Sequence, residues 1–331
     1  MDGDIIKSIN TCFKEFLANT VNLTQNDYEN GRSSRNWLFN QISKFPERNA
    51  DFPTLAPAYN FTFGSFGRKT KIRPLDDIDI MVGLNGFNGK YTTYSDYIKI
   101  DTDKMPDAKL RSFDDGNNNI NSRKILEIFK KELKNIPQYE SAEIKRNHEA
   151  VTLQLKSGLN FDIVPCFHTT KEIDEREYYL IPDGDSTWKK TDPKIMQDKL
   201  SIVNQNNNGN VLNQVRLVKY WNKRQTMPSI SSYLLETLVM NYYNTHSFVN
   251  IKNDFRSNLA YINNCIDQPI NDPNDIDCNI NELDQTTIAK LKNKTYYDYH
   301  TCCDAINLEE KGEITEAKKL WKKIFGDEFD G

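Results

Sequence analysis

The sequence has no long apolar run, no excess of basic residues and no regular cysteine framework. No stretch approaches the roughly 18 apolar residues that a membrane span needs, so we expect no transmembrane helix. The acidic start, Met1 to Asp4, lacks a signal-peptide pattern and favours a cytoplasmic protein. With 43 basic and 47 acidic residues, the net charge is −4, so stable binding to duplex nucleic acid is not expected. Any nucleotide site must therefore be a local basic cleft.

The cysteines give no sign of a disulfide or metal framework. Six of them are scattered along the chain, which indicates reduced thiols in a cytosolic protein. His300, Cys302 and Cys303 lie close enough in sequence to suggest part of a zinc site. However, no second pair of ligands follows at usable spacing, and tetrahedral zinc requires four. Structural or incidental thiols are the better interpretation.

The chain is long enough, at 331 residues, for a sizeable core and about two domains. Its 37% apolar and 27% charged residues are typical of a globular chain. Strand patterns are frequent before Pro165 and fade after it, where helical patterns dominate. We therefore predict a first domain with N-terminal helices and a strand-rich core over residues 1–166, and a mostly helical domain over 167–331. The predicted helices of the second domain cover residues 194–204, 211–224, 231–246, 251–264, 286–307 and 313–325.

Two carboxylates in an apolar run form the most informative motif. Asp77 and Asp79 alternate with Ile78 and Ile80, so in a strand both acids point to one face and the isoleucines to the other. Side-by-side carboxylates repel unless a cation lies between them, and Mg²⁺ prefers such oxygen ligands. Asp-x-Asp alone is weak, since it also occurs at Asp2/Asp4, Asp101/Asp103, Asp183/Asp185 and Asp275/Asp277. Only the pair at 77 and 79 lies in a β-branched run and follows a Gly-Ser turn.

That turn is Gly64-Ser65, at the end of a predicted strand over 59–63. Glycine lets backbone N–H groups approach a phosphate, and the following residues can begin a short helix whose N-terminus favours anions. Arg68 and Lys69 add positive charge. Taken alone, the turn is equally typical of an ordinary strand-to-helix connection.

A third acid, Asp162, stands between Phe161 and Ile163 in a later predicted strand. Taken alone, it is better explained as a solvent-facing residue. Together with Asp77 and Asp79, it completes the set of three acids that a site for two Mg²⁺ ions normally uses.

Two predicted helices in the second half carry residues that suit a nucleotide. Arg216, Lys219 and Lys223 lie on one helical face, although a solvated basic face is the simpler explanation. The next helix begins near Ser231, Ser232 and Tyr233, where the serines can act simply as caps.

These motifs, in this order, resemble the polymerase-β type of nucleotidyltransferase and, more narrowly, the bacterial CD-NTases. Those are cyclic-oligonucleotide synthases related to cyclic GMP–AMP synthase and oligoadenylate synthase. The resemblance is carried by the run Gly64 to Val82, Phe161 to Pro165, Ile181 to Asp183 with Trp188, Lys219 to Trp221, Ser231 to Glu236, and Trp321 to Gly326. It implies an α+β fold: a mixed sheet with flanking helices plus a C-terminal helical domain, forming two lobes around an active-site cleft.

The resemblance also implies roles for individual residues. Asp77, Asp79 and Asp162 would be catalytic and hold two Mg²⁺ ions, with Mn²⁺ as an alternative. Gly64 and Ser65 would bind the donor triphosphate. Lys219 and Ser232 would reach the same triphosphate from the helical domain, and Tyr233 would stack on the donor base.

The expected function is Mg²⁺-dependent condensation of NTPs, ATP among them, into a cyclic di- or trinucleotide that activates a downstream effector in antiphage defence (CBASS). Two alternatives remain: a non-cyclising nucleotidyltransferase acting on RNA, protein or a small molecule, and a catalytically silent nucleotide-binding module. The pI near 5.7 argues against RNA tailing, and the intact acids argue against silence. In some relatives a C-terminal glycine is conjugated to cellular targets. For Gly331 we favour the simpler view that the chain merely ends there.

Overall fold

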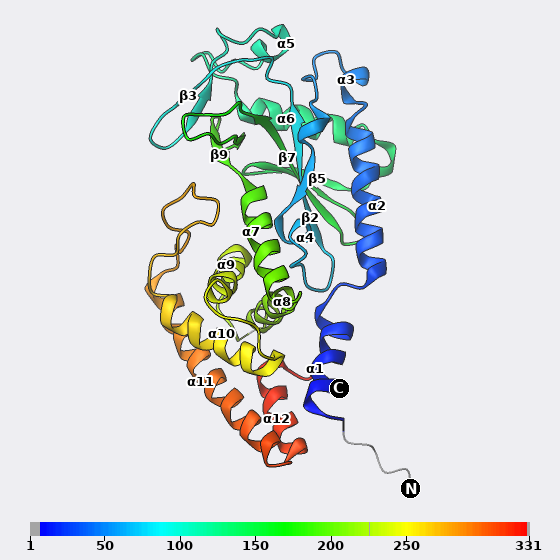
Figure 1. Cartoon of the computed structure of the whole chain (residues 1–331). Coiled ribbons are helices and arrows are strands. Elements are labelled where there is room, and N and C mark those ends of the chain that lie inside the picture. The colour runs from blue at the N-terminus through cyan, green and yellow to red at the C-terminus, as the bar shows by residue number, and fades with distance from the viewer. Residues whose placement is uncertain (1–6, 225, 330–331) are drawn as a thin grey trace. The chain divides into compact units, whose positions relative to one another are not determined.

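The computed structural model describes residues 7–224 and 226–329 of the chain (Figure 1). They divide into two compact units. We call residues 26–67 and 75–194 the sheet unit. The helical unit consists of the described residues up to Gln25, Arg68–Pro74 and those from Ile195 onward. Gly331 lies outside the described residues, so the structure tests neither of the two views of this residue.

The sheet unit is built on one mixed sheet. In the described chain its strands are β1 Phe61–Phe63, β2 Asp77–Leu84, β3 Tyr91–Thr93, β4 Ile98–Ile100, β5 Glu143–Asn147, β6 Ala150–Gln154, β7 Asn160–His168, β8 Tyr179–Pro182 and β9 Trp188–Thr191. The order is β1-β2-β7-β8-β9-β4-β3, while β6 pairs with both β5 and β7. Strands β2 and β7 run parallel, whereas β1 and β6 pair antiparallel with them. The predicted mixed sheet is confirmed.

Helices in the sheet unit bury apolar faces on this framework. They are α2 Gln25–Ile42, α3 Phe45–Arg48, α4 Gly64–Gly67, α5 Ala108–Arg111 and α6 Ser122–Lys134. In α6 the buried Phe129 contacts the rings of Phe45 and Phe52 at centroid distances of 6.4 and 4.9 Å. The N-cap of α6 is Asn121, whose Oδ1 accepts a 3.1 Å bond from the amide of Lys124.

Strands β8 and β9 were not predicted. The predicted domain boundary between residues 166 and 167 falls inside β7, so it does not coincide with a division between the two compact units. The reason is that β8 is buried at all four positions and therefore shows no alternation of apolar and polar residues. Trp188 at the start of β9 is fully buried and donates a 2.7 Å hydrogen bond to the carbonyl of Ile120.

The helical unit contains α1 Ile9–Phe16, α7 Pro193–Asn206, α8 Val211–Asn222, α9 Ser232–Tyr243, α10 Ile251–Cys265, α11 Gln285–Glu310 and α12 Ile314–Phe325. The six helices predicted after residue 193 are confirmed, with ends shifted by a few residues. Helix α1, expected to belong to the first domain, lies beside α12 of the helical unit instead (Figure 1). The ring of Phe13 lies 4.9 Å from those of Trp321 and Phe329.

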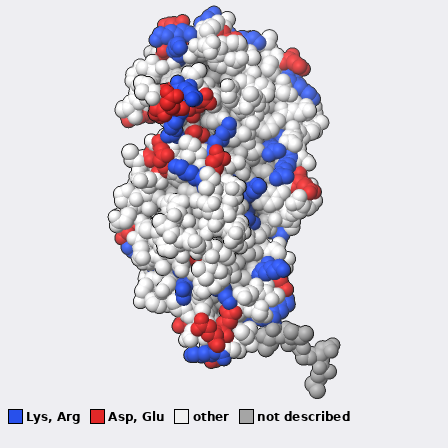
Figure 2. All heavy atoms as spheres, in the orientation of Figure 1, with Lys and Arg blue, Asp and Glu red and all other residues white. Residues whose placement is uncertain are grey.

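Charged residues of both signs are interspersed on the face shown in Figure 2, without one continuous basic band. This agrees with the small net charge of −4. None of the described helices is both long enough and apolar enough to cross a membrane.

Candidate active site

Strand β2 presents two of the predicted acids on one face. Ile78 and Ile80 are fully buried, while Asp77 and Asp79, which alternate with them, are half-buried. The parallel register with β7 places Asp79 directly beside Asp162, and Asp77 beside Asn160. Residues in register on neighbouring strands share a face. The structure therefore brings Asp77, Asp79 and Asp162 together on the same side of the sheet.

Gly64 lies against this acidic face. Phe63, the last residue of β1, pairs with Asp79, and Gly64 begins α4 with a φ of +61°. A Cβ at Gly64 would stand 1.8 Å from Oδ2 of Asp79, so no larger residue fits. The Gly64-Ser65 turn thus approaches the second carboxylate as closely as a backbone can.

A neighbouring strand orients Asp162. Thr152 of β6 is its cross-strand partner, and the Thr152 hydroxyl donates a 2.6 Å hydrogen bond to Oδ1 of Asp162. Thr152 is buried, at 6% exposure, so water does not compete freely for this bond. Sequence reasoning missed Thr152 because the register of β6 against β7 cannot be read from either strand alone.

The donor set suits a hard divalent cation, since three carboxylates from two adjacent strands supply only oxygen ligands. The absence of a side chain at Gly64 leaves room beside Asp79 that any Cβ would fill. In the described part of the chain, no three His, Cys, Asp or Glu side chains are gathered as a metal cluster. The fit therefore rests on the strand register and the chemistry of the ligands.

Lys219 lies in the helical unit, in a buried ion network. Its Nζ donates a 2.8 Å bond to Glu236 of α9, and Nε of Arg68 donates a 2.7 Å bond to the other oxygen of the same carboxylate. The Glu236 side chain is fully buried, and those of Lys219 and Arg68 are 6% and 8% exposed. The simpler explanation of a solvated face is therefore wrong for Lys219.

The electrostatics of this network favour an ionised Glu236. Burial by itself raises the pKa of the carboxyl group, but Arg68 and Lys219 outweigh that effect and hold the pKa below its ordinary value. The carboxylate of Glu236 thus bonds to both cations, and the three side chains together carry a net positive charge. Glu236 was part of the Ser231–Glu236 run, but its partners could not be identified from sequence.

The start of α9 holds the remaining predicted residues. Ser231 is the cap, accepting a 3.2 Å bond from the Tyr233 amide, and Ser232 is the exposed first residue of the helix. The Tyr233 hydroxyl donates a 2.5 Å bond to Asp272, and the Arg68 guanidinium lies over the Tyr233 ring, 5.6 Å from its centroid. Burial, and then the bond to Asp272, raise the pKa of Tyr233, so its phenol stays neutral.

Comparison with known proteins identifies the family. Residues 88–204 match the model of the Second Messenger Oligonucleotide or Dinucleotide Synthetase domain (SMODS). A probable cyclic nucleotide synthase of Bacillus cereus (strain VD146) is 38% identical over 328 residues, covering 98% of each chain. The chain belongs to the bacterial CD-NTase family. It is accordingly a nucleotidyltransferase of the kind that makes cyclic oligonucleotides.

Solved CD-NTases share this fold at low sequence identity. CdnC of Escherichia coli MS115-1, solved with ATP, matches with a TM-score of 0.69 and 19% identity, covering 97% of this chain and 99% of that chain. DncV of Vibrio cholerae, a cyclic AMP–GMP synthase, matches with a TM-score of 0.70 and 13% identity, covering 98% of both chains. At these identities the likeness concerns the fold alone.

The predicted site residues thus form two groups. Gly64, Ser65, Asp77, Asp79 and Asp162 lie together in the sheet unit, and Lys219, Ser232 and Tyr233 lie in the helical unit. Their individual roles remain predictions.

Proposed function

We propose that this CD-NTase condenses NTPs, ATP among them, into a cyclic di- or trinucleotide and releases pyrophosphate, with two Mg²⁺ ions held by Asp77, Asp79 and Asp162. Mn²⁺ would serve in their place. The observation that carries the proposal is the register of β2 and β7, which sets Asp79 beside Asp162 while Gly64 meets Asp79. When bound, the ions lower the pKa of the acceptor hydroxyl and neutralise charge on the leaving pyrophosphate.

The chain's own residues position the donor nucleotide. Gly64 and Ser65 bind the triphosphate, since the backbone at Gly64 comes close to the acidic face. Lys219 and Ser232 bind the same triphosphate from the helical unit. The ion network with Glu236 supports this role, because the 2.8 Å bond to Glu236 limits the rotamers of Lys219. Tyr233 stacks on the donor base.

Asp162 accepts the proton of the acceptor hydroxyl. The 2.6 Å bond from Thr152 to Oδ1 fixes the plane of the carboxylate, which supports this role because a proton acceptor must be held in a defined orientation. A linear intermediate then shifts within the site, and a second transfer closes the ring. The product activates a downstream effector in the bacterial cytoplasm, in antiphage signalling.

One assay tests this function against its alternatives. Purified protein is incubated with labelled NTPs and Mg²⁺ and then treated with phosphatase. A cyclic product has no terminal phosphate, so we expect label that resists the phosphatase. Products that lose their terminal phosphates would indicate a non-cyclising nucleotidyltransferase. Absence of any product with all four NTPs would contradict the proposal.

A further inference from the structure

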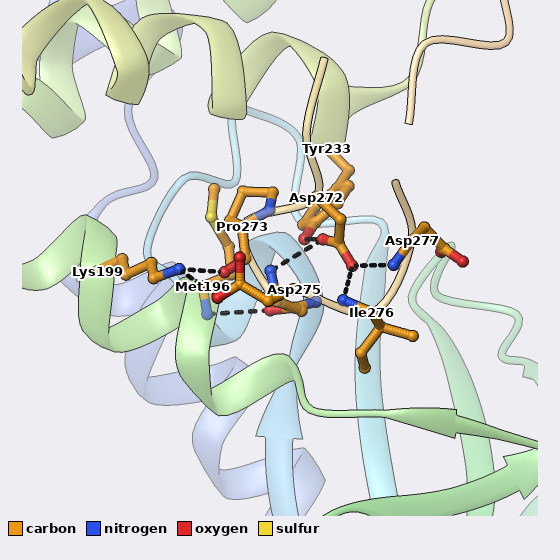
Figure 3. A network of polar contacts seen from close by, with 9 residues as sticks. Met196, Lys199, Tyr233, Asp272, Pro273, Asp275, Ile276 and Asp277 are labelled. Carbon is orange, nitrogen blue, oxygen red and sulfur yellow. Dashed lines mark hydrogen bonds and ion pairs between the residues drawn. The ribbon is translucent and has the colours of Figure 1, made fainter. Parts of the chain in front are cut away.

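The loop between α10 and α11 contacts Tyr233 through a buried acid, Asp272. We propose that Asp272 is a positioning residue for Tyr233 and, through that ring, for the base of the bound nucleotide; this rests on the proposed role of Tyr233. Asp272 lies 39 residues from Tyr233 in the chain but accepts the hydrogen bond of its phenol at 2.5 Å (Figure 3).

Uncharged hydrogen-bond donors hold the carboxylate of Asp272. Asp272 is only 5% exposed. Besides the phenol, Oδ1 accepts the amide of Asn274 at 3.0 Å, and Oδ2 accepts the amides of Ile276 and Asp277 at 3.4 Å each. None of these four donors carries a charge. Hydrogen bonds to an ionised acceptor are stronger than bonds between neutral groups, so the phenol is held firmly.

The loop that carries Asp272 is itself fixed on α7. Oδ1 of Asn274 accepts a 3.1 Å bond from the amide of Met196, and Nζ of Lys199 donates a 2.6 Å bond to the carbonyl of Pro273 (Figure 3). A second contact of Lys199, with Asp275 at 3.1 Å, is largely exposed and adds little. Asp272 therefore offers Tyr233 an anchor that is tied to a second helix.

Two contacts then define the ring of Tyr233. Asp272 holds its hydroxyl, and Arg68, itself bonded to Glu236, lies over one ring face at 5.6 Å. A base that stacks on Tyr233 must use the opposite face. Loss of the phenol hydroxyl would let the ring turn away from that geometry. We expect loss of the hydroxyl to weaken nucleotide binding more than it slows the chemical step.

Four variants separate positioning from a merely structural role. Tyr233→Phe removes the bond to Asp272 but keeps the ring and the backbone bonds that Asp272 accepts within the loop. Asp272→Asn keeps an acceptor oxygen and the shape, whereas Asp272→Ala removes all four bonds. Tyr242→Phe, the same exchange in the same helix, is the matched control.

The readout is the affinity for α,β-methylene ATP with Mg²⁺ by calorimetry, since its bridging carbon prevents release of pyrophosphate. We expect Tyr233→Phe and Asp272→Ala each to weaken binding by about tenfold, the effect of one hydrogen bond to a charged group. Asp272→Asn should recover much of the loss, and Tyr242→Phe should bind like the wild type. The variant carrying both Tyr233→Phe and Asp272→Ala should be no weaker than Asp272→Ala alone.

The outcomes distinguish two failures. If Tyr233→Ala weakens binding while Tyr233→Phe does not, the ring binds the base without help from Asp272, and the inference is wrong. If even Tyr233→Ala binds normally, or the wild type does not bind, then the proposed base site is wrong and the inference fails with it. Additive losses in the double variant would also overturn the positioning role.

Discussion

At Gly64 the backbone comes so near the carboxylate of Asp79 that one added carbon would collide with it. The position also has a positive φ, which L-residues with a side chain adopt at a cost of about 1–2 kcal/mol. A side chain at position 64 would therefore cause both backbone strain and a collision with Asp79. At Gly116 a side chain would cause only the backbone strain, since φ is +87° and nothing lies within 4 Å of an added Cβ.

We predict that Gly64→Ala lowers cyclic nucleotide synthesis by about 100-fold, because displacement of a catalytic group by about 1 Å has that effect. Gly116→Ala should lose similar stability in thermal melts but keep its activity. Equal activity of the two variants would show that the approach to Asp79 does not matter for catalysis.

A second residue-scale prediction concerns Glu236, the fully buried carboxylate between Arg68 and Lys219. Glu236→Gln removes the negative charge and leaves two cations without their counter-charge, so we expect a loss of about 3–5 kcal/mol in the free energy of unfolding. The control is Glu15→Gln, which breaks an exposed ion pair with Lys7 and should cost at most about 1 kcal/mol.

The effect of Glu236→Gln should depend on pH. The pKa of Glu236 is lower in the folded than in the unfolded protein, so its stabilisation is fully present above the unfolded pKa of about 4.3 and is lost as pH falls below it. In urea titrations, the gap between wild type and Glu236→Gln should therefore narrow at acid pH. A gap that stays constant down to about pH 3 would contradict this.

At the scale of elements, the β6–β7 pairing supplies an orienting hydroxyl to the acidic face. Thr152→Val removes the bond to Asp162 without a large change in shape, and we expect kcat to fall by about tenfold, the equivalent of roughly 1.4 kcal/mol. Thr152→Ser retains the hydroxyl and should keep most of the activity. Steady-state kinetics at saturating Mg²⁺ measure both, and unchanged kcat in Thr152→Val would remove Thr152 from the site.

Elements with a strong local pattern could be predicted from sequence, and those defined by their partners could not. The alternation around Asp77 and Asp79 identified β2, and apolar periodicity identified α7 to α12. Strand β8 is short and buried at every position, and β9 has four residues of which only Trp188 is buried, so neither strand shows a clear alternation of apolar and polar residues. The residues that follow α1, 17–21, form a π-helical turn rather than regular α-helix.

The site shows the same division. Side-chain chemistry alone pointed to the three acids, the Gly-Ser turn, Lys219 and Tyr233. It did not point to their partners Thr152, Glu236 and Asp272, because each depends on a contact across strands or between distant segments. Arg68 illustrates this: its charge suggested a phosphate contact, but in the structure it pairs with Glu236 and covers Tyr233.

At the scale of the whole molecule, the sheet unit carries the carboxylate face and the helical unit carries the cationic network. Each unit is built around its own buried core, and the proposed reaction needs residues from both. The small net charge of −4 agrees with free nucleotides, rather than a long nucleic acid, as the substrate.

The most direct test of the central claim is the synthesis of phosphatase-resistant product from labelled NTPs by the variant carrying both Asp77→Asn and Asp79→Asn. The exchanges keep the size of both side chains but remove the charges that would hold the metal ions. We predict that the wild type forms product with Mg²⁺, whereas the variant forms none yet melts cooperatively as a folded protein. Turnover by the folded variant at the wild-type rate would contradict the assignment of Asp77 and Asp79.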